Sequence, residues 1–329
     1  MIIAVDAMGG DNAPNVVVQG SLQASDEMDI DIILLGDEKA ISGELEGCGN
    51  RKRIKIHHCS ETVQMGEPPM KAVLKKTDSS IRVAFELLKK GRVNAVVSAG
   101  HSGATMASGI LTLGKMDGVE RPAIASILPG DKGRVILIDV GGNVDCRPVH
   151  ILKFGIMADA FATSYLGFKN PKIGLLNIGQ EAGKGNEQVR LANDLLKESS
   201  LNYIGNVEGY DILSGNVQIV LCDGFVGNIV LKLSEGIAEA VVSRLKTDMN
   251  KSLRGKLLAT FGKRFLRQFE GTVDYAEYGG APILGIKGVA VVCHGSSSSK
   301  AIKNAIKMAV HFVENRVQDK LIRQISLSH

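Results

Sequence analysis

Short apolar runs recur along the chain, separated by longer stretches whose apolar residues lie three and four positions apart. The runs are rich in Val, Ile and Leu at almost every position, which is typical of strands buried on both faces of a parallel sheet. They cover residues 2–5, 31–35, 93–98, 134–140, 172–178, 217–222 and 288–293. Helical patterns lie at residues 14–25, 79–90, 102–113, 149–165, 186–198 and 299–316. This alternation predicts a three-layer α/β fold with a mostly parallel sheet.

Six of these segments share one design, in which an apolar run stops at a loop of Gly, Asp, Asn or Ser and a helical pattern follows. The six segments are residues 2–11, 96–104, 136–145, 174–187, 220–228 and 291–300. The carboxyl ends of parallel strands lie along one edge of a sheet, so loops that are distant in sequence meet there. We therefore expect the six loops to form one large site.

One segment departs from the alternation of strands and helices. No low-complexity linker divides the chain, so we expect a single α/β domain over residues 1–329, with residues 241–270 as a helical excursion within it. Apolar residues recur in this excursion at helical spacing. Residues 244–267 hold eight basic side chains against one acidic side chain, whereas the whole chain has a formal net charge of only +4. The segment is therefore a basic amphipathic helix, with a kink or hairpin expected at Gly255 and Gly262.

Composition excludes several classes of protein. With 329 residues, of which 44% are hydrophobic, the chain is long enough to bury a substantial core. Trp is absent and aromatic residues are only 4%, so base stacking is disfavoured and we expect no nucleic-acid partner. The five cysteines are odd in number and never spaced as C-x-x-C, which suits a reducing cytosol. Neither a secretory leader nor a membrane-spanning run is expected.

The common catalytic motifs are absent from the sequence. The stretch that begins at Gly183-Lys184-Gly185 lacks the third glycine of a dinucleotide fingerprint. Residues 280–285 resemble the start of a P-loop, but Ile286 stands where the phosphate-binding lysine is required. Neither a G-x-S-x-G nor an H-E-x-x-H motif occurs, and no His/Cys cluster has ligand spacing, so serine-hydrolase and zinc mechanisms have little support.

The remaining candidate chemistry is the binding of anions. Three Gly/Ser loops, at residues 100–103, 184–186 and 295–298, each precede a predicted helix. Unpaired N–H groups and the positive end of the helix dipole attract phosphate to such positions. An ordinary helix cap is the alternative for each loop taken alone.

Several side chains in the loops can each be assigned either a functional or a structural role. Lys184 could neutralise a phosphate or a developing oxyanion, or remain a solvated loop lysine. Asp6 and Asp11 flank Gly9-Gly10, where we favour the positioning of donors over the binding of a metal. Asp11 could alternatively cap the helix that follows.

Two histidines and one cysteine are candidates for a more direct role. His101 and His294 could carry protons or simply donate hydrogen bonds to an anion. Cys222, at the end of a predicted strand, could carry an acyl group. We favour a packed thiol, because the neighbouring Asp223 would raise rather than lower the pKa of Cys222.

These loops, in this order, resemble those of the phosphate acyltransferases that open bacterial phospholipid synthesis. Such enzymes convert acyl-[acyl carrier protein] and inorganic phosphate into acyl phosphate. The resemblance covers nearly the whole chain. It is carried by AVDAMGGD at 4–11, VSAGHSGA at 97–104, LIDVGGNVD at 137–145, LLNIGQE and KGNE within 175–187, IGNVEG at 204–209, DGFVGN at 223–228, YGGAPILG at 278–285 and HGSS at 294–297.

The resemblance implies a fold like that of isocitrate and isopropylmalate dehydrogenases and of phosphotransacetylases. It also implies a cytoplasmic homodimer that associates peripherally with the inner face of the cell membrane. Its partners would be acyl carrier protein, inorganic phosphate and the membrane glycerol-3-phosphate acyltransferase that consumes acyl phosphate. Many relatives carry Asn at the position of His101, so an imidazole there is not expected to be an indispensable base.

The chemistry implied is direct attack of phosphate on a thioester, with no metal, nucleotide or nicotinamide. Phosphate is already nucleophilic and a thioester is an activated acyl group, so the protein must mainly position the reactants and stabilise an oxyanion. The candidate catalytic residues are Lys184, Asn177, Asn186 and Asn228. The candidate phosphate- and substrate-binding residues are Asp6, Gly9, Gly10, Asp11, Gly100, His101, Ser102, Gly103, Asp139, Asn143, Glu181, Gly185, Asp223, Gly224, His294, Gly295 and Ser296.

Alternatives remain open at this point. A phosphotransacetylase-like enzyme would use coenzyme A, a dehydrogenase-like enzyme would use NAD, and a lipid- or carrier-binding scaffold would do no chemistry. The basic excursion also has three interpretations, which are a membrane-inserted tip, a homodimer contact and a contact with acidic carrier protein. The apolar residues expected at this tip or contact are Leu253, Leu257, Leu258, Phe261 and Phe265.

Overall fold

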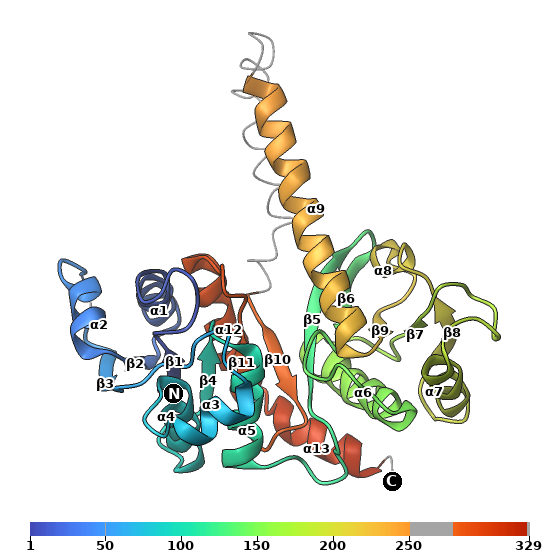
Figure 1. The fold of residues 1–329 in the computed structure, drawn as a ribbon, viewed down its shortest axis with the longest axis horizontal. Helices are drawn as coiled ribbons and strands as arrows, with labels where there is room; N and C mark the ends of the chain where they lie inside the picture. Colours follow the sequence, from blue (N-terminus) through green and yellow to red (C-terminus); the bar gives the residue numbers. More distant parts are fainter. Residues whose placement is uncertain (50, 251–278, 328–329) are drawn as a thin grey trace.

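A single eleven-stranded sheet, with helices on both faces, forms the centre of the protein (Figure 1). The structure is a computed structural model, and it describes residues 1–49, 51–250 and 279–327. The strands lie in the order β3-β2-β1-β4-β11-β10-β5-β6-β9-β7-β8. Their bounds are β1 Ile2–Asp6, β2 Asp31–Gly36, β3 Ile54–His58, β4 Ala95–Ser98, β5 Ala123–Gly130, β6 Gly133–Ile138, β7 Ile173–Leu176, β8 Tyr203–Val207, β9 Ile219–Leu221, β10 Ala281–Leu284 and β11 Ala290–Val292.

The helices cover the two faces of the sheet and give the protein two hydrophobic layers. They are α1 Asn15–Met28, α2 Glu38–Leu45, α3 Pro69–Lys75, α4 Ser80–Lys89, α5 Ser102–Leu113, α6 Pro148–Phe161 with the π-helical turn Ala162–Leu166, α7 Glu187–Lys197, α8 Asp211–Ser214, α9 Gly224–Asn250, α12 Ser299–Glu314 and α13 Val317–Leu327. Buried residues of α1, α6, α7, α12 and α13 form one core with the sheet. Residues of α3, α4, α5 and α8 form the other, and the start of α9 packs against it. The predicted three-layer α/β fold is confirmed.

Three antiparallel pairings at the centre of the sheet reverse its direction. β10 is antiparallel to β11 and to β5, and β5 is antiparallel to β6. The other neighbouring pairs are parallel, so β6, β9, β7 and β8 run opposite to β1, β2, β3, β4 and β11. β10 and β5 lie between β11 and β6. Across these two strands, the register places the last residue of β11, Val292, almost level with the last residue of β6, Ile138. The loops of the two halves therefore approach the centre of the sheet from opposite directions.

The antiparallel steps change the expectation that all strand ends share one edge. Within each half the strands are parallel and the expectation holds. Between the halves it is wrong, because the reversal at β10 and β5 points the ends of β6, β9, β7 and β8 in the opposite direction to those of β1, β4 and β11. Only loops that follow strands near the reversal can meet across it.

The seven apolar runs all became strands, but four further strands were not predicted. β5 and β10 contain Ala, Ser, Pro and Gly among few branched residues, so their apolar pattern is weak. β3 and β8 lie at the two ends of the strand order, where half-exposed strands do not need an unbroken apolar run. The predicted helices occur close to their expected bounds, and α5 begins and ends at the predicted residues.

Helix α9 is 27 residues long and rises away from the body of the protein between the two halves of the sheet (Figure 1). Its first turns pack against the sheet, and its far end extends beyond it. The predicted excursion at residues 241–270 thus begins as the last part of α9. The expected tip residues Leu253, Leu257, Leu258, Phe261 and Phe265 lie outside the described residues.

Candidate functional site

A buried carboxylate stands at the end of β1. Asp6 is 4% exposed, and its carboxylate accepts hydrogen bonds from the Ser80 hydroxyl at 2.6 Å and the Ser98 hydroxyl at 2.8 Å. Burial raises the pKa of Asp6, and these donors oppose the shift because they stabilise the charged form. Ser98 ends β4 and Ser80 begins α4, so Asp6 joins three elements of the first half. Its contacts favour a positioning role.

A second buried carboxylate occupies the corresponding place in the other half, at the end of β6. Asp139 is fully buried and accepts hydrogen bonds from the backbone N–H groups of Ile124 at 2.9 Å, Gly142 at 3.0 Å and Asn143 at 2.6 Å. The Asn143 side-chain amide donates to the same carboxylate at 2.9 Å and to the Pro122 carbonyl at 2.7 Å. Burial raises the pKa of Asp139, and the four donors oppose that shift.

The loops of the first half pack backbone against backbone. A Cβ atom at Gly9 would lie 2.5 Å from the backbone nitrogen of Gly100, so only glycine allows the β1 and β4 loops to approach this closely. The backbone N–H of Asp11 donates to the Gly295 carbonyl at 2.8 Å, which joins the β1 loop to the β11 loop. Three of the predicted loops are therefore brought together.

A cavity of about 830 Å³ lies beside these loops, at the junction of the two halves. The first half contributes Asp11, Gly100 and Ser102 to its walls, and the second contributes Gly141 and Asn228. The walls also include the run from Val292 to Ser298, the β5 residues Ile124, Ser126 and Ile127, and the start of β10. Five of the six predicted loops thus meet at one site.

Helix α9 forms one wall of this cavity, to which it contributes the predicted Asn228 and further residues that were not predicted from sequence. Asn228, Lys232 and Glu235 all line the cavity. They are spaced i, i+4 and i+7, so they share one face of the helix. This spacing is the signal that could have identified Lys232 and Glu235, but it lies inside a long helix rather than in a glycine-rich loop.

His294 lies in the cavity wall between a hydroxyl and a carboxylate. Its Nδ1 atom is 2.7 Å from the Ser296 hydroxyl oxygen and accepts a hydrogen bond from the Ser296 backbone N–H at 3.3 Å. Its Nε2 atom is 3.9 Å from Oε2 of Glu235. Burial raises the pKa of Glu235, and His294 opposes that shift.

The three candidate helix N-termini differ in how they are capped. Asn186 caps α7 by accepting from the Val189 N–H at 2.9 Å, and Ser298 caps α12 by accepting from the Ala301 N–H at 3.3 Å. At α5 the N-cap residue is His101, whose side chain makes no capping hydrogen bond. Its Nε2 atom instead lies 3.2 Å from the Glu67 carbonyl oxygen. Because Gly100 and Ser102 line the cavity, the N-terminus of α5 is the best placed of the three to receive an anion.

The loop at residues 177–186 is placed apart from this group. The Asn177 amide donates to the Lys184 carbonyl at 3.1 Å, and the Asn206 amide donates to the Glu181 carbonyl at 3.2 Å, so side chains hold the loop in shape. Lys184 and Glu181 are exposed, and the side chains of both lie close to Gly179. None of the residues from Asn177 to Asn186 is among those that line the cavity.

The remaining candidates of the second half organise the start of α9. The Asp223 carboxylate accepts from the Val226 N–H at 2.8 Å and so caps the helix. The Gly224 N–H donates to the Asn143 carbonyl at 2.7 Å. Cys222 is buried, with its Sγ atom 3.6 Å from the Asp139 carbonyl oxygen. Burial, together with the charges of Asp139 and Asp223, raises the pKa of Cys222 well above its usual value, which favours the packed-thiol interpretation.

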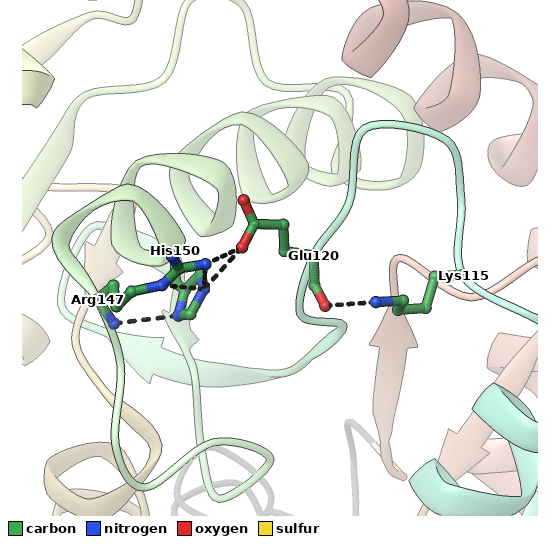
Figure 2. Close-up of polar contacts among 4 residues, drawn as sticks. All are labelled: Lys115, Glu120, Arg147 and His150. Carbon is green, nitrogen blue, oxygen red and sulfur yellow. Dashed lines mark hydrogen bonds and ion pairs between the residues drawn. The ribbon is translucent and has the colours of Figure 1, made fainter.

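A polar cluster fixes the segment that leads into β5 (Figure 2). The Glu120 carboxylate pairs with Arg147 and lies 3.3 Å from Nε2 of His150, while Lys115 donates to the Glu120 carbonyl at 3.0 Å. Nδ1 of His150 accepts from the Arg147 N–H at 3.0 Å, and burial lowers the pKa of His150. The cluster ties the start of α6 to the residues just before Pro122, and thereby supports the Asp139 network.

Two further features of the described part of the chain bear on the site. Within residues 1–49, 51–250 and 279–327, no group of three or more His, Cys, Asp and Glu side chains is arranged to hold a metal ion. No helix in the same ranges is both long and apolar enough to cross a membrane. The arrangement offers backbone N–H groups, hydroxyls, an amide, an ammonium group and a His-carboxylate pair around the cavity.

Comparisons with known proteins place the chain in context. A family model described as "Fatty acid synthesis protein" matches residues 1–320. The chain is 50% identical to the phosphate acyltransferase of Trichlorobacter lovleyi, over 99% of this chain and 95% of the relative. It is 49% identical to the phosphate acyltransferase of Syntrophotalea carbinolica, over 100% of this chain and 95% of the relative.

Solved structures with a similar fold are more distant in sequence. A phosphotransacetylase from Streptococcus pyogenes has a TM-score of 0.61 at 18% identity, covering 97% of this chain and 94% of that chain. A 4-hydroxythreonine-4-phosphate dehydrogenase from Klebsiella pneumoniae has a TM-score of 0.54 at 14% identity, covering 95% of this chain and 99% of that chain. These likenesses show the fold alone, which is the dehydrogenase-like fold that was predicted.

The close approach of α9 to the Asp139 loop generates a stability prediction. A Cβ atom at Gly227 would lie 1.9 Å from the Asp139 carbonyl oxygen, so Gly227→Ala should lower the free energy of unfolding by about 1–3 kcal/mol or more. Gly236→Ala is the matched control on the same helix, because nothing lies within 4 Å of its added methyl group. The control should be neutral or stabilise by up to about 1 kcal/mol. Denaturant unfolding of both variants measures the difference, and equal stabilities would contradict the packing described.

Proposed function

We propose that this chain, which belongs to the phosphate acyltransferase family of enzymes, transfers a long-chain acyl group from acyl-[acyl carrier protein] to inorganic phosphate. The product is acyl phosphate, which supplies phosphatidic acid synthesis. The observation that carries the proposal is the cavity at the junction of the two halves, where glycine-rich loops and the uncapped start of α5 meet apolar walls. Such a site can receive an anion and an acyl thioester side by side.

The lining of the cavity suits both reactants. The backbone N–H groups at the start of α5 and the Ser102 hydroxyl are donors for a phosphate dianion. Apolar side chains that include Ile124, Leu231 and Val242 line another part of the wall, where they would contact an acyl chain. A phosphate held at ~3–3.5 Å from the thioester carbonyl carbon would be positioned for attack.

The proposed reaction needs no covalent intermediate. Phosphate attacks the thioester carbonyl directly, and donors stabilise the tetrahedral oxyanion until the thiolate departs. Asn228 is the proposed catalytic residue that lines the cavity. Lys184, Asn177 and Asn186 remain proposed catalytic residues, and their exposed loop would have to act on a substrate that extends beyond the cavity. We propose no metal, nucleotide or nicotinamide.

The proposed assembly is a homodimer formed through α9. Large apolar side chains recur along this helix at every fourth position, and Leu233 and Ile237 are 60% and 55% exposed. The stripe consists of Phe225, Ile229, Leu233, Ile237 and Val241. It lies on the opposite side of the helix from Asn228 and Glu235, because residues at i+4 and i+7 share a face. An exposed apolar stripe of this kind is typical of a helix that packs against a partner.

The proposed location is the cytoplasmic face of the cell membrane. A long-chain acyl phosphate is lipophilic and destined for a membrane glycerol-3-phosphate acyltransferase, so delivery at the bilayer would protect it. The basic segment at residues 244–267 is the proposed contact with anionic lipid, where each basic residue contributes about 1 kcal/mol. Carrier-protein contact and dimer packing remain the alternatives for this segment.

One assay tests the proposed activity. The protein is incubated with palmitoyl-carrier protein or palmitoyl-CoA, with and without phosphate, and thiol release is followed. Phosphate-dependent thiol release that favours the carrier-protein substrate is the expected result. Preference for the CoA thioester would indicate a phosphotransacetylase-like enzyme, and NADH formation from isopropylmalate and NAD would indicate a dehydrogenase. Release of thiol without phosphate would overturn the proposal.

Lys184→Ala should lower turnover by at least about 10-fold, because removing a charged donor to a transition state costs a few kcal/mol. Lys172→Ala is the matched control, since Lys172 is an exposed lysine just before the opposite end of β7. Steady-state kinetics with saturating phosphate and carrier-protein substrate measure both variants. If Lys184→Ala retains wild-type turnover and phosphate affinity, Lys184 is a solvated loop lysine.

Cys222→Ala should keep most of the activity, because direct attack by phosphate leaves no step for a thiol nucleophile. The measurement combines turnover with mass spectrometry of protein quenched during reaction with a labelled acyl thioester. Trapping the labelled acyl group on Cys222 would show that the direct mechanism is wrong.

Leu233→Glu/Ile237→Glu should convert the proposed dimer into monomers, since it places two carboxylates in the apolar stripe of α9. Sedimentation or light scattering measures the mass of the particle. Leu191→Glu is the control, because Leu191 is a 49% exposed leucine on α7, away from the stripe. A wild-type protein that is itself monomeric, or a variant that stays dimeric, would rule out this interface.

Leu257→Glu/Leu258→Glu should abolish co-sedimentation with anionic vesicles while leaving dimer mass and activity on soluble substrate unchanged. The two carboxylates would oppose insertion of an apolar face beside anionic lipid. Neutral vesicles serve as the lipid control. Wild-type vesicle binding by the variant, or its dissociation into monomers, would contradict the membrane assignment.

A further inference from the structure

The His294 and Glu235 pair lies in the same cavity but has no part in the mechanism described so far. The two residues come from distant parts of the chain, the β11 loop and the interior of α9, and both line the cavity. Nε2 of His294 is 3.9 Å from Glu235, and Nδ1 is 2.7 Å from the Ser296 hydroxyl oxygen. The imidazole therefore connects a hydroxyl on one side with a carboxylate on the other.

The exposure of the two side chains suits proton transfer. His294 is 50% exposed and can meet a bound substrate, whereas Glu235 is only 21% exposed although it lies on a projecting helix. A partly buried carboxylate beside an imidazole stabilises the imidazolium when a proton arrives. Among the residues that the structure describes, the other charged groups that line the cavity are Lys232 and Glu239, on the same helix, and Asp11, in the β1 loop beside Gly295.

The reaction of the proposed function has a step for which such a proton is needed. The tetrahedral intermediate can expel either the thiolate or the phosphate that has just added. An alkyl thiol has a pKa of about 8.5, whereas the second pKa of a phosphoryl group is about 6, so phosphate is the weaker base and the better leaving group. The intermediate would mostly revert to reactants unless the sulfur receives a proton as the carbon–sulfur bond breaks.

We propose that His294, paired with Glu235, protonates the departing sulfur and is then reprotonated by the acylated phosphate. This inference rests on the proposed function and deepens it. The imidazolium Nε2–H passes its proton to sulfur while the carbon–sulfur bond breaks. The neutral imidazole that remains keeps its other proton on Nδ1, which faces the Ser296 hydroxyl oxygen, so the proton that hydrogen phosphate loses on acylation returns to Nε2. The balance is hydrogen phosphate dianion plus thioester giving acyl phosphate dianion plus thiol.

In this scheme His294 is a catalytic residue and Glu235 is a positioning residue. The scheme predicts that the importance of both residues depends on the basicity of the leaving thiolate. An alkyl thiolate such as that of pantetheine needs the proton, whereas a nitrothiophenolate is a weak base and departs without one. A residue that only supports the fold, or only binds phosphate, would affect both substrates equally.

The test compares octanoyl-pantetheine with the octanoyl thioester of 4-nitrothiophenol at saturating phosphate. His294→Gln should lower kcat/KM for the pantetheine thioester by about 100-fold, the scale of general acid catalysis, and that for the aryl thioester by less than about 3-fold. Glu235→Gln should lower the first by about 10-fold with the same selectivity. His57→Gln, at an exposed histidine on the edge strand β3, is the control and should change neither.

The ratio of the two substrates is measured on one preparation, so partial unfolding of a variant cancels out. Equal losses on both thioesters in the His294 and Glu235 variants would overturn the proposal. A loss confined to His294→Gln would overturn the role of Glu235. Failure of the proposed function is distinguishable, because the wild-type protein would then release no thiol in a phosphate-dependent manner from either thioester.

Discussion

The arrangement of the cavity depends on the burial of two carboxylates at strand ends. Asp6 and Asp139 are buried, so their charges must be met by donors from the protein. Asp139 meets this need with the loop that follows β6 and with the start of β5, and Asp6 meets it with Ser80 and Ser98. The donors that satisfy the carboxylates also fix the backbone of the loops around the cavity.

The same constraint places α9. The Asp139 network holds Asn143, whose carbonyl accepts from Gly224 at the first turn of the helix, and Gly227 allows the helix to contact the Asp139 carbonyl. One face of α9 then lines the cavity and the opposite face exposes an apolar stripe. Contacts on the outer face would therefore set the position of Asn228, Lys232 and Glu235 in the cavity. This links the proposed assembly of the protein to its proposed chemistry.

The fold alone does not distinguish this protein from enzymes with other reactions. Phosphotransacetylases and 4-hydroxythreonine-4-phosphate dehydrogenases share it at low sequence identity. The cavity has features that the fold does not specify, namely an uncapped helix start, several hydroxyls and a paired histidine beside apolar walls. These features suit the proposed binding of an anion and an acyl group.

The sequence by itself determined most of the parallel strands, the principal helices and the loops that carry the candidate chemistry. Buried strands need unbroken apolar runs and amphipathic helices need a 3.6-residue period, so both patterns are local and readable. It also determined the family, because the glycine-rich loops occur together and in order.

Only the tertiary structure decided which loops meet. β5 and β10 have weak local patterns, yet their antiparallel pairing reverses the sheet. The loops after β6 and β9 then line the cavity together with those after β1, β4 and β11, whereas the loop of Lys184, after the more distant β7, does not. The tertiary structure also brought Glu235 close to His294, although the two residues are 59 positions apart, because the Asp139 network directs α9 across the site. Strand direction and the path of a helix depend on contacts between distant residues, and no local pattern in the sequence encodes them.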